Sequence, residues 1–421
     1  MVWDLIIFGP KPNNIYFMPL VKPFSALIPA AHLQSSVVTR PLEYYSTGEA
    51  KLIASENNYS FLHLISPALD HAYLRDMNQD LVFRKIAENF DTFVNGKVLI
   101  PVNRSCYYIY QVHHNGFTQT GLWTLSDVRS YLDGSIKKHE LTVERREKLL
   151  ADYLQNTGLD ANPVLITYHP VEAIETITQK YIKELPVIDF VFTDLTVHKV
   201  WLIDDQKDID LITQEIEGID AVYIADGHHR AAAMSKMDYF STVFMNTDEI
   251  RVLQFNRLVR DLNGLSVKDF LARLTDSFTI EKSDKAVDPE QLHQIGMYLD
   301  AQWYVLYPKP HTYDANDPVE LLDVSILQNQ LLGPVLGIDD PRTNARITFE
   351  GGITALSEIR KMVDNSLYAV AFTLYAVSVE QIINVADANK VMPPKSTWIE
   401  PKFLVGILTN YCMHTEKSEP A

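Results

Sequence analysis

The chain has 421 residues, 47% of them hydrophobic and 22% charged, which is ordinary for a globular protein and long enough for one large domain or a few smaller ones. Its 54 acidic residues outnumber its 37 Lys and Arg residues, and the resulting net charge of −17 argues against non-specific binding to nucleic acid or to an anionic membrane. The two cysteines, Cys106 and Cys412, exclude a disulfide framework and a cysteine-based zinc site, so a cytoplasmic location is predicted. No stretch approaches the ~20 apolar residues of a membrane span, and the first residues lack the basic start of a secretory signal.

The N-terminal part predicts a mixture of helices and short strands. Residues 1–20 differ in composition from the rest and are interpreted as an extension, with Met18 as a candidate start. The patterns that follow predict a helix over 47–56, a strand over 59–66, a helix over 70–93, a hairpin of 105–113 and 119–124 that turns at His114-Asn115-Gly116, and a helix capped by Ser126 and ended by Gly134.

The middle of the chain alternates more regularly. After a helix over 143–154, for which Thr142 is the candidate N-cap, the patterns predict strands at 164–167, 187–192, 197–203, 221–225, 241–246 and 251–255, and helices at 171–185, 208–217, 231–237 and 267–274.

The C-terminal part predicts strands at 303–307 and 369–374 and helices at 324–332 and 379–385. Three prolines between 393 and 401 predict a stiff loop without regular structure, and the last residues are polar. The whole succession predicts an α+β or mixed α/β fold with no internal repeat.

The most distinctive pattern lies within residues 221–236. An apolar strand and a helix flank Asp226-Gly227-His228-His229-Arg230, which is therefore predicted to be the turn between them. A helix N-terminus presents unpaired N–H groups and a partial positive charge, and two imidazoles and a guanidinium would strengthen its attraction for anions. Gly227 would allow a close approach of the backbone. The pattern predicts a phosphate site.

Two other interpretations of this turn remain open. The five residues could be ordinary surface residues, although their succession at a strand-to-helix turn lacks a packing reason. Asp226, His228 and His229 are also all potential metal ligands. Adjacent histidines on a helix point about 100° apart and rarely chelate one ion together, so the metal interpretation carries less weight.

Two further segments carry candidate residues. His139 and Glu140 lie just before a predicted helix, where a carboxylate can be held outside a strand. Lys395, Ser396 and Thr397 lie on the proline-rich loop, and a lysine followed by two hydroxyls on a rigid loop is a candidate second anion clamp. A plain surface loop is the alternative.

Together these motifs resemble the bacterial "domain of unknown function ten-fifteen" family of the ParB and sulfiredoxin-like superfamily, over about residues 22–408. The resemblance implies a ParB/sulfiredoxin-like nucleotide-binding core over 131–260 with large additions: an N-terminal α+β region over 21–130, a C-terminal α+β region over 261–410 that completes the site, and a polar tail over 411–421. The residues that carry it are Ser60-Phe61-Leu62-His63, Gly134-Ser135-Ile136-Lys137-Lys138-His139-Glu140-Leu141-Thr142, Asp226-Gly227-His228-His229-Arg230, Leu322-Asp323-Val324-Ser325 and Met392-Pro393-Pro394-Lys395-Ser396-Thr397.

Within this superfamily the chain also resembles the archaeal ADP-dependent free-serine kinase, through three motifs in the same order. This likeness implies that Glu140 corresponds to the catalytic glutamate, that Asp226 to Arg230 correspond to the nucleotide-phosphate turn, and that Lys395, Ser396 and Thr397 correspond to the substrate-side loop.

The chain departs from these relatives at several positions. Trp398 and Ile399 stand where the kinase has Arg-His, and Lys138 replaces a proline. In Arg40-Pro41-Leu42-Glu43, Glu43 stands for the family's aspartate and the family's tyrosine is absent. Glu43 is nevertheless retained as a candidate substrate-binding residue. These departures bear on which molecule would accept the phosphoryl group.

The resulting hypothesis is phosphoryl transfer from ADP or ATP to the hydroxyl of free L-serine or a similar small metabolite, with Mg²⁺ assisted by Asp226. Glu140 and His139, with Asp226, are the predicted catalytic residues. The rival hypothesis is a nucleotide-binding switch module of the ParB type without kinase activity. Sulfiredoxin-like reductase chemistry would need a cysteine in the turn, and this chain has none there. A metal-dependent hydrolase is a further alternative.

Overall fold

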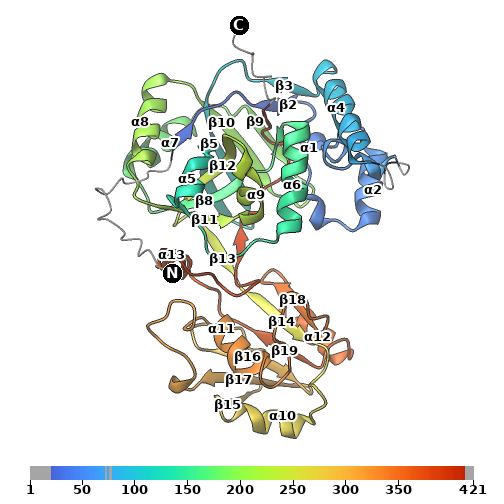
Figure 1. Ribbon diagram of the computed structural model, residues 1–421, viewed down its shortest axis with the longest axis vertical. Helices are drawn as coiled ribbons and strands as arrows, with labels where there is room; N and C mark the ends of the chain where they lie inside the picture. Colours follow the sequence, from blue (N-terminus) through green and yellow to red (C-terminus); the bar gives the residue numbers. More distant parts are fainter. Residues whose placement is uncertain (1–19, 72–73, 75–77, 413–421) are drawn as a thin grey trace, which may run out of the picture.

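The described residues, 20–71, 74 and 78–412, form two lobes that meet at a narrow waist in this computed structural model (Figure 1). Each lobe combines one mixed or antiparallel sheet with helices, which confirms the predicted α+β class. The predicted extension over residues 1–19 lies outside the described residues. None of the helices in the described part is both long and apolar enough to cross a membrane.

The larger lobe is organised around a nine-stranded sheet. Its strands follow the order β6-β11-β8-β12-β5-β4-β10-β9, and β1 pairs with β5. The pairs β8 with β12 and β6 with β11 are parallel, and the remaining pairs are antiparallel. The sheet takes strands from both sides of residue 130: β1 Val21–Lys22, β4 Tyr107–His114, β5 Phe117–Asp127, β6 Ile136–Lys137, β8 Val164–Tyr168, β9 Ile188–Val191, β10 Val197–Ile203, β11 Val222–Asp226 and β12 Tyr239–Asn246.

Amphipathic helices cover this sheet. The isoleucines of α7 and α8 pack with β8 and β11 in one buried cluster. A second cluster joins α3 and α4 to the two-stranded ribbons β2 with β3 and β7 with β21. The bounds are α1 Gln34–Val37, α2 Thr47–Glu56, α3 Leu62–Ile65, α4 Gln79–Asn95, α5 Val128–Asp133, α6 Glu144–Thr157, α7 Glu172–Tyr181, α8 Gln206–Glu217, β2 Leu27–Pro29, β3 Leu99–Pro101, β7 Leu159–Asp160 and β21 Asn410–Tyr411.

Two local predictions for this lobe are confirmed. The hairpin of β4 and β5 turns at Asn115-Gly116, both of which have positive φ, as such a two-residue turn requires. Gly134 ends α5 in the left-handed conformation, with φ of 89°.

Other local predictions are wrong. The apolar run over 59–66 contains the short helix α3 Leu62–Ile65 instead of a strand, because a helical turn brings Leu64 and the preceding Phe61 to the same side, where both pack in the α4 cluster. The next helix starts only at Gln79, and residues 72–73 and 75–77 of the predicted helix lie outside the described residues.

Two predicted helix caps are displaced by one residue. Asp127 rather than Ser126 caps α5, since the Ser126 hydroxyl is engaged with Thr242 inside the sheet. Val143 rather than Thr142 occupies the cap position of α6, without a side-chain hydrogen bond.

The smaller lobe holds a six-stranded antiparallel sheet in the order β15-β17-β16-β19-β14-β18. The predicted helix over 324–332 is α11 followed by a π-helical turn over Gln328–Leu332. The elements of the smaller lobe are β14 Phe255–Val259, α10 Val267–Leu274, β15 Phe278–Ser283, β16 Ile295–Leu299, β17 Gln302–Pro308, α11 Asp323–Leu327, β18 Ile347–Gly351, α12 Leu356–Asp364 and β19 Val370–Thr373.

The waist brings the C-terminal chain back to the larger lobe. Strand β13 Arg251–Leu253 pairs with β20 Trp398–Glu400, so the prediction that the proline-rich stretch has no regular structure is wrong for these three residues. Helix α13 Val379–Asp387 packs Ile383 and Ala386 against Tyr223 of β11. Residues 391–402 are thereby fixed beside the end of β11.

Asp323, from the motif Leu322-Asp323-Val324-Ser325, gives a testable pH dependence. Its buried carboxylate accepts the His293 amide at 3.0 and 3.2 Å, and burial raises its pKa to about 7 against the opposing effect of this hydrogen bond. A carboxyl whose pKa is raised by folding makes its full contribution to the stability of the folded state below its unfolded pKa of about 3.9. This contribution is lost as the pH rises from there through the folded pKa of about 7.

We therefore expect the free energy of unfolding to fall between pH 5 and pH 8, with up to roughly 2.5 kcal/mol of that loss due to Asp323. In Asp323→Asn, which cannot ionise, part of this loss should disappear. Chemical denaturation at both pH values measures the difference. An equal pH dependence in the variant and the wild type would contradict the prediction.

Candidate functional site

The strand-to-helix turn is tighter than predicted. Asp226 is the last residue of β11, Gly227 alone links strand and helix, and α9 runs over His228–Ala233. The three residues His228, His229 and Arg230 therefore form the first turn of the helix rather than a loop. Gly227 has φ of 101°, a conformation that favours glycine.

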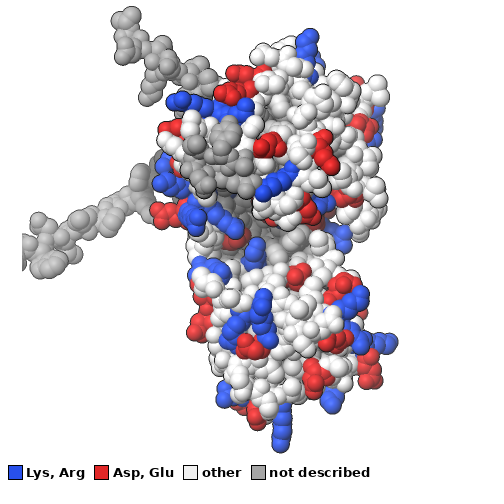
Figure 2. All heavy atoms as spheres, turned by 90° about the vertical axis from the view of Figure 1, so that its right-hand side faces the viewer, with Lys and Arg blue, Asp and Glu red and all other residues white. Residues whose placement is uncertain are grey.

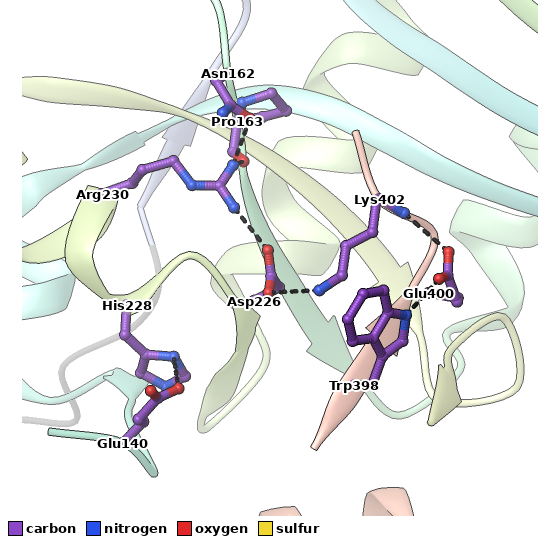
Figure 3. A network of polar contacts seen from close by, with 9 residues as sticks. All are labelled: Glu140, Asn162, Pro163, Asp226, His228, Arg230, Trp398, Glu400 and Lys402. Carbon is purple, nitrogen blue, oxygen red and sulfur yellow. Dashed lines mark hydrogen bonds and ion pairs between the residues drawn. The ribbon is translucent and has the colours of Figure 1, made fainter. Parts of the chain in front are cut away.

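Asp226 lies between two cations. Its Oδ2 is 2.7 Å from Nη2 of Arg230, and its Oδ1 is 3.0 Å from Nζ of Lys402, which comes from the C-terminal segment (Figure 3). Burial by itself would raise the pKa of Asp226, but Lys402 and Arg230 outweigh it and lower the pKa to about 2. The carboxylate is charged at any physiological pH.

Arg230 is fixed by several acceptors. Besides Asp226, its Nη1 donates to Oδ1 of Asn162 at 2.6 Å and to the carbonyl of Pro163. The guanidinium lies against Gly227, where a Cβ atom would come within 2.9 Å of Nη2. The glycine is thus needed both for its φ and for the space that Arg230 occupies.

Glu140 lies on the other side of the turn, beside two buried histidines. Its Oε2 is 3.6 Å from Nδ1 of His228 (Figure 3). The His228 ring packs edge-on against that of His139, with ring centroids 4.4 Å apart. Burial raises the pKa of Glu140, and Asp226 adds to the effect against opposition from Lys395. The carboxylate remains 41% exposed, so a ligand can reach it.

The histidines do not supply the positive charge expected from the sequence. Burial lowers the pKa of His139 to about 4 and lowers that of His228 well below its usual range. Burial and Arg146 also lower the pKa of His229, whose Nε2 accepts the amide of Val143 at the start of α6. These rings are neutral at pH 7, and the cations at the turn are Arg230 and Lys402.

The loop that carries Lys395, Ser396 and Thr397 closes the site from the waist. Lys395 is exposed, has φ of 57°, and its carbonyl accepts from the buried guanidinium of Arg257 at 2.9 Å. Ser396 is buried and donates its hydroxyl proton to the Pro393 carbonyl at 2.6 Å, so this hydroxyl is engaged in holding the loop.

The segment before α2 reaches the same region. Glu43 and Tyr44 form part of the 3₁₀ turn Leu42–Tyr44, and both are exposed. Burial raises the pKa of Tyr44, with Lys402 opposing and Asp226 adding to the shift, which places this phenol near the ion pair.

Sequence reasoning missed Lys402, Tyr44 and Arg257. Lys402 lies in the proline-rich stretch already singled out, and Tyr44 is adjacent to Glu43, so proximity to the motifs was an available signal. Arg257 carried no such signal, because only the waist brings β14 beside Lys395.

The electrostatics favour an anionic ligand. Arg146, Arg230, Lys395 and Lys402 all act on Asp226, Glu140 or His229, and Glu147 also acts on His229, so four cations face three carboxylates. Figure 2 shows Lys and Arg side chains around the constriction between the lobes. This local excess of positive charge contrasts with the net charge of −17 of the whole chain.

A metal ion fits this arrangement poorly. No group of three or more His, Cys, Asp or Glu side chains within residues 20–71, 74 and 78–412 could hold one. Both oxygens of Asp226 are paired with cations, so the expected role of Asp226 in holding Mg²⁺ does not match its surroundings.

A cavity of about 740 Å³ lies elsewhere, between α2 and α4, where His63 and Asp70 pair. It shares no residue with the cluster around Asp226. The charged cluster around Asp226 and this cavity are therefore separate features.

Fold and geometry together define a two-lobed α+β protein with a cluster of cationic and carboxylate side chains at a strand-to-helix turn near the junction of its lobes. The family model described as "Protein of unknown function (DUF1015)" matches residues 21–325, and the chain belongs to this family. A search of curated proteins finds no match.

Solved structures show weaker likenesses. Free serine kinase in complex with AMP is 12% identical with a TM-score of 0.38, covering 68% of this chain and 92% of that one. A conserved hypothetical protein from Pyrococcus furiosus is 12% identical with a TM-score of 0.35, covering 67% and 91%. SbnI with a C-terminal truncation, from Staphylococcus aureus, is 11% identical with a TM-score of 0.36, covering 68% and 87%. Likenesses of this degree do not establish substrate or activity.

Proposed function

We propose that the protein is a phosphotransferase that moves a phosphoryl group from ADP or ATP to the hydroxyl of a small metabolite, with free L-serine as the first candidate. The observation that supports this most is the position of Glu140, an accessible carboxylate with a raised pKa, beside a turn whose cations suit phosphate groups. A base next to an anion site is the minimum that phosphoryl transfer requires.

The roles follow from the geometry and from the motif resemblance. Arg230 and the backbone amides of Gly227, His228 and His229 bind the nucleotide phosphates. Asp226 holds Arg230 in place. His139 and His228, as neutral rings, form the buried wall that positions Glu140.

The acceptor lies between the turn and the waist in this proposal. Lys395 and Thr397 face it from the proline-rich loop, Ser396 holds the loop shape, and Glu43 contacts its far side. Trp398 and Ile399 do not replace the missing Arg-His, because the Trp398 indole donates to Glu400 at 2.6 Å and Ile399 is buried.

The reaction balances without a redox partner. The bond between the terminal phosphorus of the nucleotide and its bridging oxygen breaks, and a bond forms from that phosphorus to the acceptor oxygen. Glu140 accepts the hydroxyl proton, and the leaving nucleotide keeps the electrons of the broken bond. Positioning and charge neutralisation by the cations supply most of the rate in such a reaction.

The proposal is tested by incubating the protein with ADP or ATP, with and without Mg²⁺, and a panel of hydroxylated metabolites that includes serine, followed by phosphorus NMR. Formation of O-phosphoserine or another phosphate ester supports it. Nucleotide binding without a phosphorylated product would favour the rival hypothesis of a nucleotide-binding switch module.

A further inference from the structure

Asp226, the acidic residue of the turn, has no free oxygen. Arg230 occupies Oδ2 and Lys402 occupies Oδ1, and the side chains of these three residues are 32%, 19% and 22% exposed in the order Asp226, Arg230 and Lys402. The group is therefore partly buried but still reached by solvent, and it carries one more positive than negative charge.

Lys402 is held in this place from several directions. It follows β20, its amide donates to Oε2 of Glu400 at 3.2 Å, and its Nζ lies 5.3 Å from the Trp398 ring centroid. Burial by itself would lower the pKa of Lys402, but Asp226 and Tyr44 outweigh it and keep the pKa raised. The ammonium is fixed and charged before any ligand arrives.

A magnesium ion prefers octahedral oxygen ligands and would need at least one carboxylate oxygen at about 2.1 Å. At Asp226 it would have to displace an ammonium or a guanidinium and would then sit beside both cations. Glu140, the carboxylate proposed as the base, lies on the far side of the turn beside His228 (Figure 3).

We propose that Lys402 and Arg230, clamped on either side of Asp226, form a fixed cation pair that binds the phosphate chain of the nucleotide without a metal ion held by the protein. This rests on the proposed function and deepens it. Lys402 contacts phosphate directly, whereas Asp226 is a positioning residue that holds the side chains of both cations in place. Any Mg²⁺ is bound by the nucleotide alone.

The test is isothermal titration calorimetry of the full chain with ADP and with inorganic pyrophosphate, in EDTA and in Mg²⁺. Wild-type protein should bind both in EDTA within about fivefold of its affinity in Mg²⁺. Lys402→Met should lose at least about tenfold in EDTA, as expected for loss of one charged hydrogen bond to phosphate, and Mg²⁺ should not restore it.

Two variants make the result specific. Lys402→Arg keeps the charge and should retain metal-free binding, and thermal unfolding of each variant checks that it is folded. Lys180→Met removes a lysine paired with Asp208 on the far helices α7 and α8, and it should bind as the wild type does.

Two other results overturn the inference in distinguishable ways. Binding that requires Mg²⁺ in the wild type, or wild-type affinity in folded Lys402→Met, overturns the fixed cation pair and leaves the proposed function standing. Absence of ADP and pyrophosphate binding under all conditions, together with absence of ATP binding in the same titration, overturns both.

Discussion

Replacing Glu140 with glutamine is expected to lower turnover by roughly 100-fold or more while nucleotide affinity changes by less than about twofold. The amide keeps the size of the side chain and its place 3.6 Å from His228 but cannot accept the hydroxyl proton. Single-turnover kinetics and nucleotide titration separate the two effects.

The pH profile gives an independent signature. Because burial raises the pKa of Glu140, the rate in the wild type should rise with pH through a value above the ordinary one for glutamate. This limb should be absent from the residual activity of Glu140→Gln. Glu144→Gln, an exposed glutamate in the first turn of α6, is the matched control and should be without effect. Lost nucleotide affinity with preserved turnover would show that Glu140 is not the base.

The Gly227→Ala substitution is the second change from which a large effect is expected. Alanine at φ of 101° is strained by about 1–2 kcal/mol, and its Cβ would lie 2.9–3.0 Å from three atoms of the Arg230 guanidinium. This end of the arginine cannot simply swing away, because Asp226, Asn162 and Pro163 hold it. We expect nucleotide affinity to fall at least about tenfold in addition to the loss of stability.

Gly134→Ala provides the matched control. Gly134 has a similar φ of 89°, but nothing lies within 4 Å of the position its Cβ would take. By chemical denaturation, Gly134→Ala should lose only the free energy that comes from its φ, Gly227→Ala should lose more because of the added contact with Arg230, and only Gly227→Ala should bind nucleotide weakly. Equal nucleotide affinity in the two variants would contradict the role assigned to Arg230.

The sequence by itself determined features that depend on local chemistry. The Asn115-Gly116 hairpin, the end of α5 at Gly134 and the bounds of α2 follow from turn preferences, caps and the 3.6-residue period. The strand-to-helix placement of Asp226 and Arg230 follows from composition alone, although the helix begins at His228, three residues earlier than predicted.

Only the tertiary structure decided which charges act at the site. The two histidines of the turn are neutral because neighbouring elements bury them, and no local pattern reports burial. Lys402 reaches Asp226 across 176 residues of chain because β20 pairs with β13 at the waist, a non-local pairing that turn and helix preferences do not encode. The sequence thus determined that charged residues would gather at this strand-to-helix turn, and long-range packing determined that a lysine and an arginine, rather than histidines, supply the positive charge there.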